Sequence, residues 1–259
     1  LPGEAYLGNS IGGFFSSLQE IVTSPADLAP RVVAMEQAKM MADKFNEVAM
    51  LVDETKAGLV SQLTQQTDAV NILSSELAAV NQQIAATGTA RPNNALLDSR
   101  DAMIDRISEY VAVTVELSAT GVAKLTLGES GNGPAIVNGN KSQKIGVDPQ
   151  DRSIAFIVAP GAANLVTSQV VNGSLNGVAE AYETASIAMS EIDELAFTLV
   201  RDMNAIHQQG LDLEGQPGKA LFQDIDINLS PNPTNVGPVM AEAEILDPRQ
   251  LQADVHTLS

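Results

Sequence analysis

Residues 176–209 read NGVAEAYETASIAMSEIDELAFTLVRDMNAIHQQ, and this stretch decides the fold class. Its apolar positions recur at alternating steps of three and four residues, without a break over about four heptads. The periodicity predicts a long helix with one continuous apolar seam, ended by Gly210. The seam consists of Tyr182, Ala185, Met189, Ile192, Ala196, Leu199, Met203 and Ile206.

A second, longer helix is predicted from about Pro25 to about Ala86. The tetrapeptide SPAD at 24–27 predicts its start, because serine can cap free N–H groups, proline suits the first helical position and aspartate complements the helix dipole. A four-residue step from Leu59 to Leu63 is a stutter, which locally unwinds a left-handed supercoil. The seam positions are Phe45, Val48, Val52, Thr55 and Leu59, then Leu63, Gln66, Val70, Leu73, Leu77, Val80 and Ile84.

The polar face of this helix carries almost no charge. Between Ala57 and Ala90 the only charged residues are Asp68 and Glu76. Solvated helices usually carry pairs of glutamate and lysine instead. Two interpretations stay open: a neutral surface in water, or a surface that packs against neighbouring subunits, where charged side chains would be costly to desolvate.

Two shorter amphipathic helices are predicted, at 9–22 and at about 94–111, the latter capped by Asn93 or Asn94. Arg100 falls at the centre of the apolar face of the second one. Since guanidinium keeps its charge, we expect Arg100 to be partly buried against carbonyl or carboxylate partners, with extension into solvent as the alternative. The apolar faces are Ile11, Phe14, Phe15, Leu18 and Val22, and Leu96, Leu97, Met103, Ile104, Ile107 and Val111.

From Val113 the apolar period changes to two, which predicts strands. The stretches 113–117 and 122–127 flank a hairpin signal at 119–121, strands continue at 135–137 and 154–158, and another is predicted at 239–246. The fold class is therefore α+β, mainly helical: a long-helix bundle interrupted by a β-rich insertion, with a partial β-rich segment at the C-terminus.

These elements predict three regions. Residues 1–112 and 173–222 form a helical bundle domain, and residues 113–172 form a β-rich inserted lobe. Residues 223–259 are loop and strand, the start of a second β-rich region. We expect the two long helices to pack side by side, because neither seam can be left in water.

Composition excludes several function classes. The 259 residues carry a net charge of −18, which repels nucleic acid and anionic lipid, and aromatic residues make up only 3%. The absence of cysteine excludes disulfides and thiol catalysis. No apolar run approaches the roughly 20 residues of a membrane span, and the first four residues, LPGE, show no cleaved signal peptide.

No cluster predicts a catalytic, cofactor or metal site, so we expect a protein that is not an enzyme. Asp98, Asp101 and Asp105 share the solvent side of their helix, and a hydrolase using such acids is the alternative. The segment 224–228 starts like a calcium loop but has Leu229 and Asn235 where that loop needs glycine and glutamate.

The remaining glycine-rich and histidine positions also lack the chemistry of a site. The segment 210–218 follows a helix rather than opening one, and 131–133 lacks a lysine and a following helix, so neither predicts a phosphate cradle. His207 and His256 have no neighbouring ligand or carboxylate partner. We expect His207 to cap free carbonyls at the end of its helix.

Four segments resemble the flagellar hook-associated protein 1 family. They keep order and spacing across about residues 9–222, and the last resembles the family's Asn-x-x-His-x-x-Gly-x-Asp element. The segment PNNALLDSRD resembles a family signature, with Ala95 inserted and Ser99 in place of glutamine. The segments are GGFFSSL through SPADLAPR at 12–31, PNNALLDSRD at 92–101, GSLNG at 173–177 and NAIHQQGLDLEGQPGKALF at 204–222.

The resemblance implies a helical domain with β insertions, and a structural role at the junction of hook and filament in the bacterial flagellum. It implies an extracellular place, export by the flagellar secretion apparatus, and partners among hook protein, a second junction protein and further copies in a ring. The family's terminal helical segments, which drive polymerisation, are not expected in this chain. We therefore expect the middle of such a protein, monomeric in isolation.

Two alternatives stay open. A related flagellar axial protein, such as hook-associated protein 3 or a flagellin-like protein, would share the long seams. A non-flagellar helical scaffold or signalling coiled coil would share the helices rich in alanine, glutamine and serine, although the β block between the helices argues against it.

Overall fold

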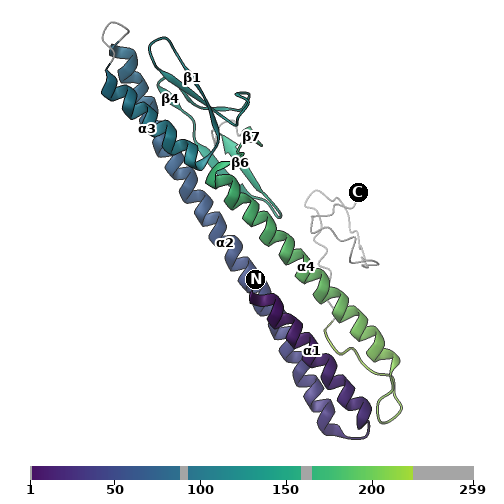
Figure 1. The fold of residues 1–259 in the computed structure, drawn as a ribbon. Helices are drawn as coiled ribbons and strands as arrows, with labels where there is room; N and C mark the ends of the chain where they lie inside the picture. The colour runs from purple at the N-terminus through teal and green to yellow at the C-terminus, as the bar shows by residue number, and fades with distance from the viewer. Residues whose placement is uncertain (1, 88–92, 159–164, 224–259) are drawn as a thin grey trace, which may run out of the picture. The chain divides into compact units, whose positions relative to one another are not determined.

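The computed structural model describes residues 2–87, 93–158 and 165–223, and it has the predicted α+β, mainly helical class (Figure 1). The helices are α1 (Pro2–Thr23), α2 (Leu28–Thr87), α3 (Asn94–Tyr110) and α4 (Gly173–Gln209). Between α3 and α4 lie the strands β1 (Val113–Leu117), β2 (Ala123–Leu127), β3 (Ala135–Asn138), β4 (Lys141–Ser142), β5 (Ile145–Pro149), β6 (Ile154–Val158) and β7 (Leu165–Thr167). The strand expected at 239–246 lies outside the described residues.

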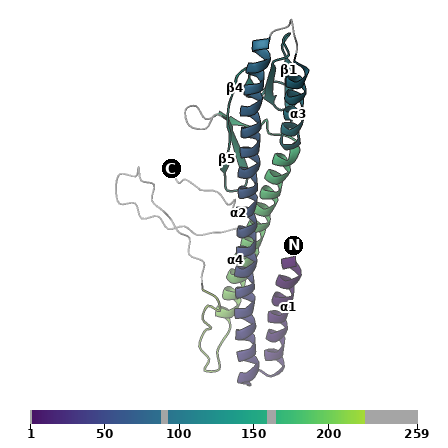
Figure 2. The ribbon, with the colours of Figure 1, turned by 90° about the vertical axis from the view of Figure 1, so that its left-hand side faces the viewer.

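The described residues form two compact units, each with its own core. The first takes residues 2–52 and 188–223. In it α1 lies alongside the first part of α2 (Figure 2), and both predicted long seams contribute to one cluster. Its buried residues are Leu7, Phe14, Ala38, Met41 and Phe45, and Ile192, Ala196, Leu199 and Met203 of α4 pack against them.

The second unit takes the described residues between 53 and 187. Its core joins the second half of α2 to α3, to the start of α4 and to the strands. The start of α4 enters this core through Leu175, with Val178 and Ala179 packed against it, all three of which precede the predicted seam. The largest fully buried side chains here include Leu63, Leu77, Ile107, Leu125, Leu127, Ile136 and Leu175.

The strands form two antiparallel sheets, ordered β1-β2-β3-β4 and β5-β6-β7. The predicted hairpin is confirmed: β1 pairs with β2 from Val113↔Leu127 to Leu117↔Ala123. Gly121 ends its turn at φ +85°, a conformation that favours glycine. Because the strands share one core with the helices, they belong to the same compact unit. The boundaries at 112/113 and 172/173 stay a prediction.

Several local expectations need correction. The helix α2 begins at Leu28 rather than Pro25, because Asp27 rather than Ser24 caps it: the Ala29 N–H donates to Asp27 Oδ1 over 3.0 Å. The helix α1 begins at Pro2, well before residue 9.

The helix ends also break the predicted apolar pattern. Ile206, the last seam position of α4, is 65% exposed, and Val22, at the end of α1, is 80% exposed. In the last turns of α4 the buried position is Asn204, at 4% exposed, so a polar contact replaces the seam there.

Candidate functional site

The residues considered for chemistry do not converge. Asp98, Asp101 and Asp105 are all exposed on α3, as expected. Among the described residues, no group of three or more histidine, aspartate or glutamate side chains is placed to hold a metal ion. The segment 224–228 and His256 lie outside the described part of the chain. The polar groups that do converge are buried side chains that bond to backbone.

We call these side chains anchors, because each one fixes a helix to the backbone of another segment. Arg100 is the first of them. It comes from α3, is 7% exposed, and donates from Nη1 to the carbonyl of Gly121 over 2.6 Å. Its Nε and Nη2 lie 2.8 Å and 2.7 Å from Asp101 Oδ1. The prediction of a buried arginine with carbonyl and carboxylate partners is confirmed. The guanidinium therefore holds the turn between β1 and β2 against the helix.

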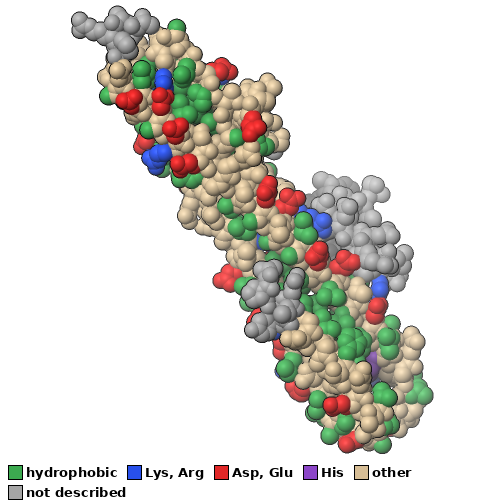
Figure 3. All heavy atoms as spheres, in the orientation of Figure 1, with side chains coloured by type: hydrophobic (Ala, Val, Ile, Leu, Met, Phe, Trp, Pro, Cys, Tyr) green, Lys and Arg blue, Asp and Glu red, His purple; other side chains and the backbone are tan. Residues whose placement is uncertain are grey.

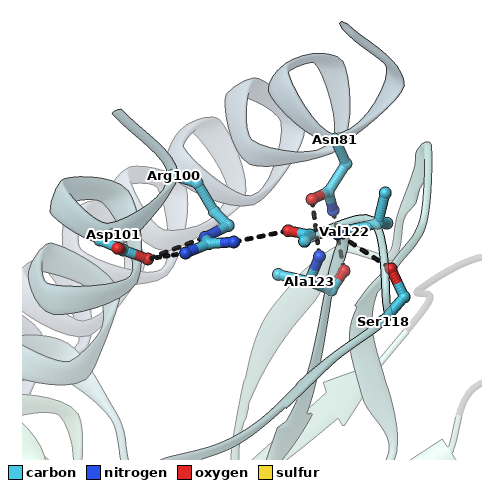
Figure 4. Close-up of polar contacts among 7 residues, drawn as sticks. Asn81, Arg100, Asp101, Ser118, Val122 and Ala123 are labelled. Atoms are coloured by element: carbon cyan, nitrogen blue, oxygen red, sulfur yellow. Dashed lines mark hydrogen bonds and ion pairs between the residues drawn. The ribbon is translucent and has the colours of Figure 1, made fainter. Parts of the chain in front are cut away.

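Asn81 is the second anchor and comes from α2. Its side chain is fully buried and bonds the backbone of Ala123 in both directions, donating to the carbonyl over 2.8 Å and accepting from the N–H over 2.8 Å. It also donates to the carbonyl of Gly139 over 2.9 Å. Figure 4 shows Asn81 and Arg100 reaching from two helices to one short segment of backbone. That segment is the turn and the start of β2.

Asn71 repeats the arrangement ten residues earlier on α2. It donates to the carbonyl of Ile145 over 2.9 Å and accepts from the N–H of the same residue over 2.8 Å. An asparagine amide can pair with a peptide group in this way because it carries one acceptor and two donors. The first residues of β2 and β5 are thus both fixed to α2, one in each sheet.

The anchors on α2 partly explain why the polar residues of this helix carry so little charge. Asn71, Asn81 and Thr67 lie on the side of the helix that the chain covers itself. Sequence reasoning missed their role, since the pattern gave residue type but no partner. The outward side of the same stretch stays exposed.

The segment 204–222, quoted above for its family resemblance, forms a second polar anchor in the first unit. Asn204 accepts from the N–H groups of Leu221 and Phe222 over 2.9 Å and 2.8 Å, and donates to the carbonyl of Phe222 over 2.9 Å. Phe222 then packs edge-on against Phe14 of α1, with 6.1 Å between ring centroids. The segment that follows α4 therefore packs back against the core of the first unit.

His207 completes this return, but not as predicted. Its Nδ1 bonds the carbonyl of Lys219, twelve residues later, rather than the last carbonyls of its own helix. The reason is the loop itself, in which Asp212 Oδ1 accepts from the N–H groups of Glu214 and Gln216 and turns the chain back. At Gly218 an added Cβ would lie 2.1 Å from the His207 carbonyl oxygen, so only glycine fits.

Comparison with known proteins identifies the family of this chain. The protein-family model described as the flagellar hook-associated protein FlgK helical domain matches residues 2–222, which is most of the chain. The chain belongs to this family. The match spans both compact units and every anchor described above.

Individual relatives give the same result. Flagellar hook-associated protein 1 of Escherichia coli is 24% identical over 98% of this chain and 48% of its own length. That of Bacillus subtilis is 24% identical over 93% of this chain and 53% of its own length. The flagellar hook junction protein FlgK from Burkholderia pseudomallei has a similar fold, with a TM-score of 0.73 and 25% identity over 83% of this chain and 40% of its own.

Two facts bound the functional conclusion. The chain spans about half the length of the curated relatives it matches. In the described part of this FlgK-family chain, none of the helices combines the length and the apolar character of a membrane span.

Proposed function

We propose that this chain is part of a structural protein of the bacterial flagellum that joins the hook to the filament, and that it is not an enzyme. The observation that carries the proposal is the match to the FlgK helical-domain model over residues 2–222. A solved relative of similar fold is named as a hook junction protein.

The polar groups of the structure support a mechanical role. Four polar side chains bond to the backbone of a strand or loop in their own unit and so join it to a helix: Arg100, Asn81, Asn71 and Asn204. Arg100 also bonds the carboxylate of Asp101. Buried polar networks that are fully satisfied make a fold rigid and unique. Rigidity of this kind suits a subunit that transmits load.

The proposal extends to place and partners. The protein lies outside the cell on the flagellum, reaches it through the flagellar secretion apparatus, and contacts hook protein, a second junction protein and further copies in a ring. The family match favours this assignment over hook-associated protein 3 and flagellin, which the sequence alone left open. The strand block within the helical domain likewise disfavours a signalling coiled coil.

A genetic experiment tests the proposal. The source bacterium is deleted for the gene and complemented with the natural protein, and flagella are examined by electron microscopy. We expect the deletion strain to make hooks without attached filaments and to export filament protein into the medium, and complementation to restore filaments. Normal filaments in the deletion strain would contradict the proposal.

A further inference from the structure

The outward side of α2 in the second unit forms an exposed line of side chains that no described segment of the chain covers. Its members recur at steps of three and four residues, so they lie along one side of the helix, away from the buried Leu63 and Leu77. At its centre Ile72 is 60% exposed. We call this line the α2 outer face; it consists of Ser61, Gln65, Asp68, Ile72, Ser75, Ala79 and Gln83, all exposed.

This face carries much less charge than the exposed side of α4. From Ala57 to Thr87 the helix has no basic residue, and Asp68 and Glu76 are its only acids. On α4, by contrast, the exposed positions include Glu180, Glu183, Glu191, Glu194, Arg201 and Asp202. Figure 3 shows acidic side chains spread over much of the visible surface, with few basic ones between them.

The low charge of the α2 outer face affects self-association, because the chain as a whole is strongly acidic. Two copies at −18 each repel one another, and like charges brought together at a contact cost several kcal/mol. Copies of this chain therefore approach most favourably through a surface with little charge. The cores of protein interfaces are likewise depleted of charged residues and more apolar than their rims.

The side chains of the face suit a close contact. Serine and alanine at 61, 75 and 79 are short, so a neighbouring surface can approach the helix backbone there. Ile72 stands among them as the one large apolar side chain, and covering it is worth roughly 1–2 kcal/mol. Asp68, four residues before Ile72, is the one acid in the line, and exposed Glu76, four residues after Ile72, lies beside the line.

We propose that the α2 outer face packs against a second copy of this chain. The inference rests on the proposed function, because a ring holds copies at the high local concentration that a weak contact needs. It goes beyond that function by naming the surface and its partner. The charge argument selects a second copy, since mutual repulsion is the obstacle that an uncharged face removes.

Light-activated crosslinking of the purified chain tests the proposal. A photoreactive phenylalanine analogue replaces Ile72, and the covalent dimer is measured from 10 µM to about 1 mM protein. Charge is added on the face with the double substitution Gln65→Glu and Gln83→Glu. The matched control, Gln19→Glu, makes the same chemical change at an exposed position of α1, in the first unit.

We expect the dimer yield to rise with concentration, to fall at least about fivefold in the double variant, and to stay unchanged in Gln19→Glu. Asp68→Asn removes the one acid of the line and should raise the yield. Equal yields in all four proteins, or no dimer at 1 mM, would overturn the proposal. If added hook protein is crosslinked to position 72 in place of a second copy, the partner assignment is wrong.

Folding and function are tested separately from this contact. Circular dichroism of each variant shows whether the substitutions leave the helices intact, as expected for exposed positions. Filament attachment in complemented cells tests the junction role independently of the crosslink. A protein that restores filaments but gives no dimer would refute the outer-face inference and leave the proposed function standing.

Discussion

Replacing Arg100 with alanine tests the best-defined anchor of the second unit. The side chain is 8% exposed, so its removal exposes or empties the space filled by its stem. The carbonyl of Gly121 also loses a charged donor at 2.6 Å. We expect the substitution to lower the free energy of unfolding by about 2–4 kcal/mol.

The magnitude follows from three contributions. Leaving the partly buried carbonyl of Gly121 without its charged donor costs about 1–3 kcal/mol. Losing the packed methylene groups of the stem adds roughly 1 kcal/mol after partial relaxation. The pair with Asp101 adds little, because that carboxylate is 58% exposed and exposed ion pairs contribute about 0–1 kcal/mol.

Urea unfolding followed by circular dichroism measures the change. Arg106→Ala is the matched control, since it removes an exposed arginine from the same helix, and we expect it to stay within about 0.5 kcal/mol. Asp101→Asn should cost less than about 1 kcal/mol. If Arg100→Ala is no more destabilising than Arg106→Ala, the guanidinium does not hold the strands and the anchor argument is wrong.

Three further predictions follow from the same structure. Asn81→Ala leaves three backbone groups without their partner and should lower the free energy of unfolding by at least about 3 kcal/mol, whereas Gln82→Ala at an exposed position should lower it by less than about 0.5 kcal/mol. Urea unfolding compares the two variants, and equal values would contradict the role of Asn81. Gly173→Ala should strongly destabilise the second unit, because the glycine has φ +74° and an added Cβ would lie 2.5 Å from the Tyr110 carbonyl oxygen; an unchanged melting temperature would rule this out. The isolated chain should be monomeric at micromolar concentration in both low and high salt, and light scattering coupled to size exclusion would disprove this by detecting a stable dimer.

The sequence predicted the elements that periodicity controls. The seam positions from Leu63 to Ile84 are buried or half-buried, because a 3–4 rhythm places them on one side of any helix. The position of Arg100 on its helix predicted its burial for the same reason. Its partner at Gly121 could not be predicted, since which turn meets α3 is a property of the folded chain.

Other features depend on contacts between distant segments. The short strand β4 and the strand β5, whose start is fixed by Asn71, carry little pattern of their own. The seam pattern predicted a buried Ile206, which is wrong, because Asn204 takes the inward position where the following loop packs back against α4. Polarity alone did not separate the anchors on α2 from its outward face.

The most direct test of the central claim is to locate the protein on intact flagella. Because the chain has no cysteine, one cysteine at exposed Gln209 can carry a gold or dye label without competing thiols in this part of the protein. Electron microscopy of labelled cells should place the label in one band between hook and filament. Label along the filament, along the hook or at the cell surface would contradict the account.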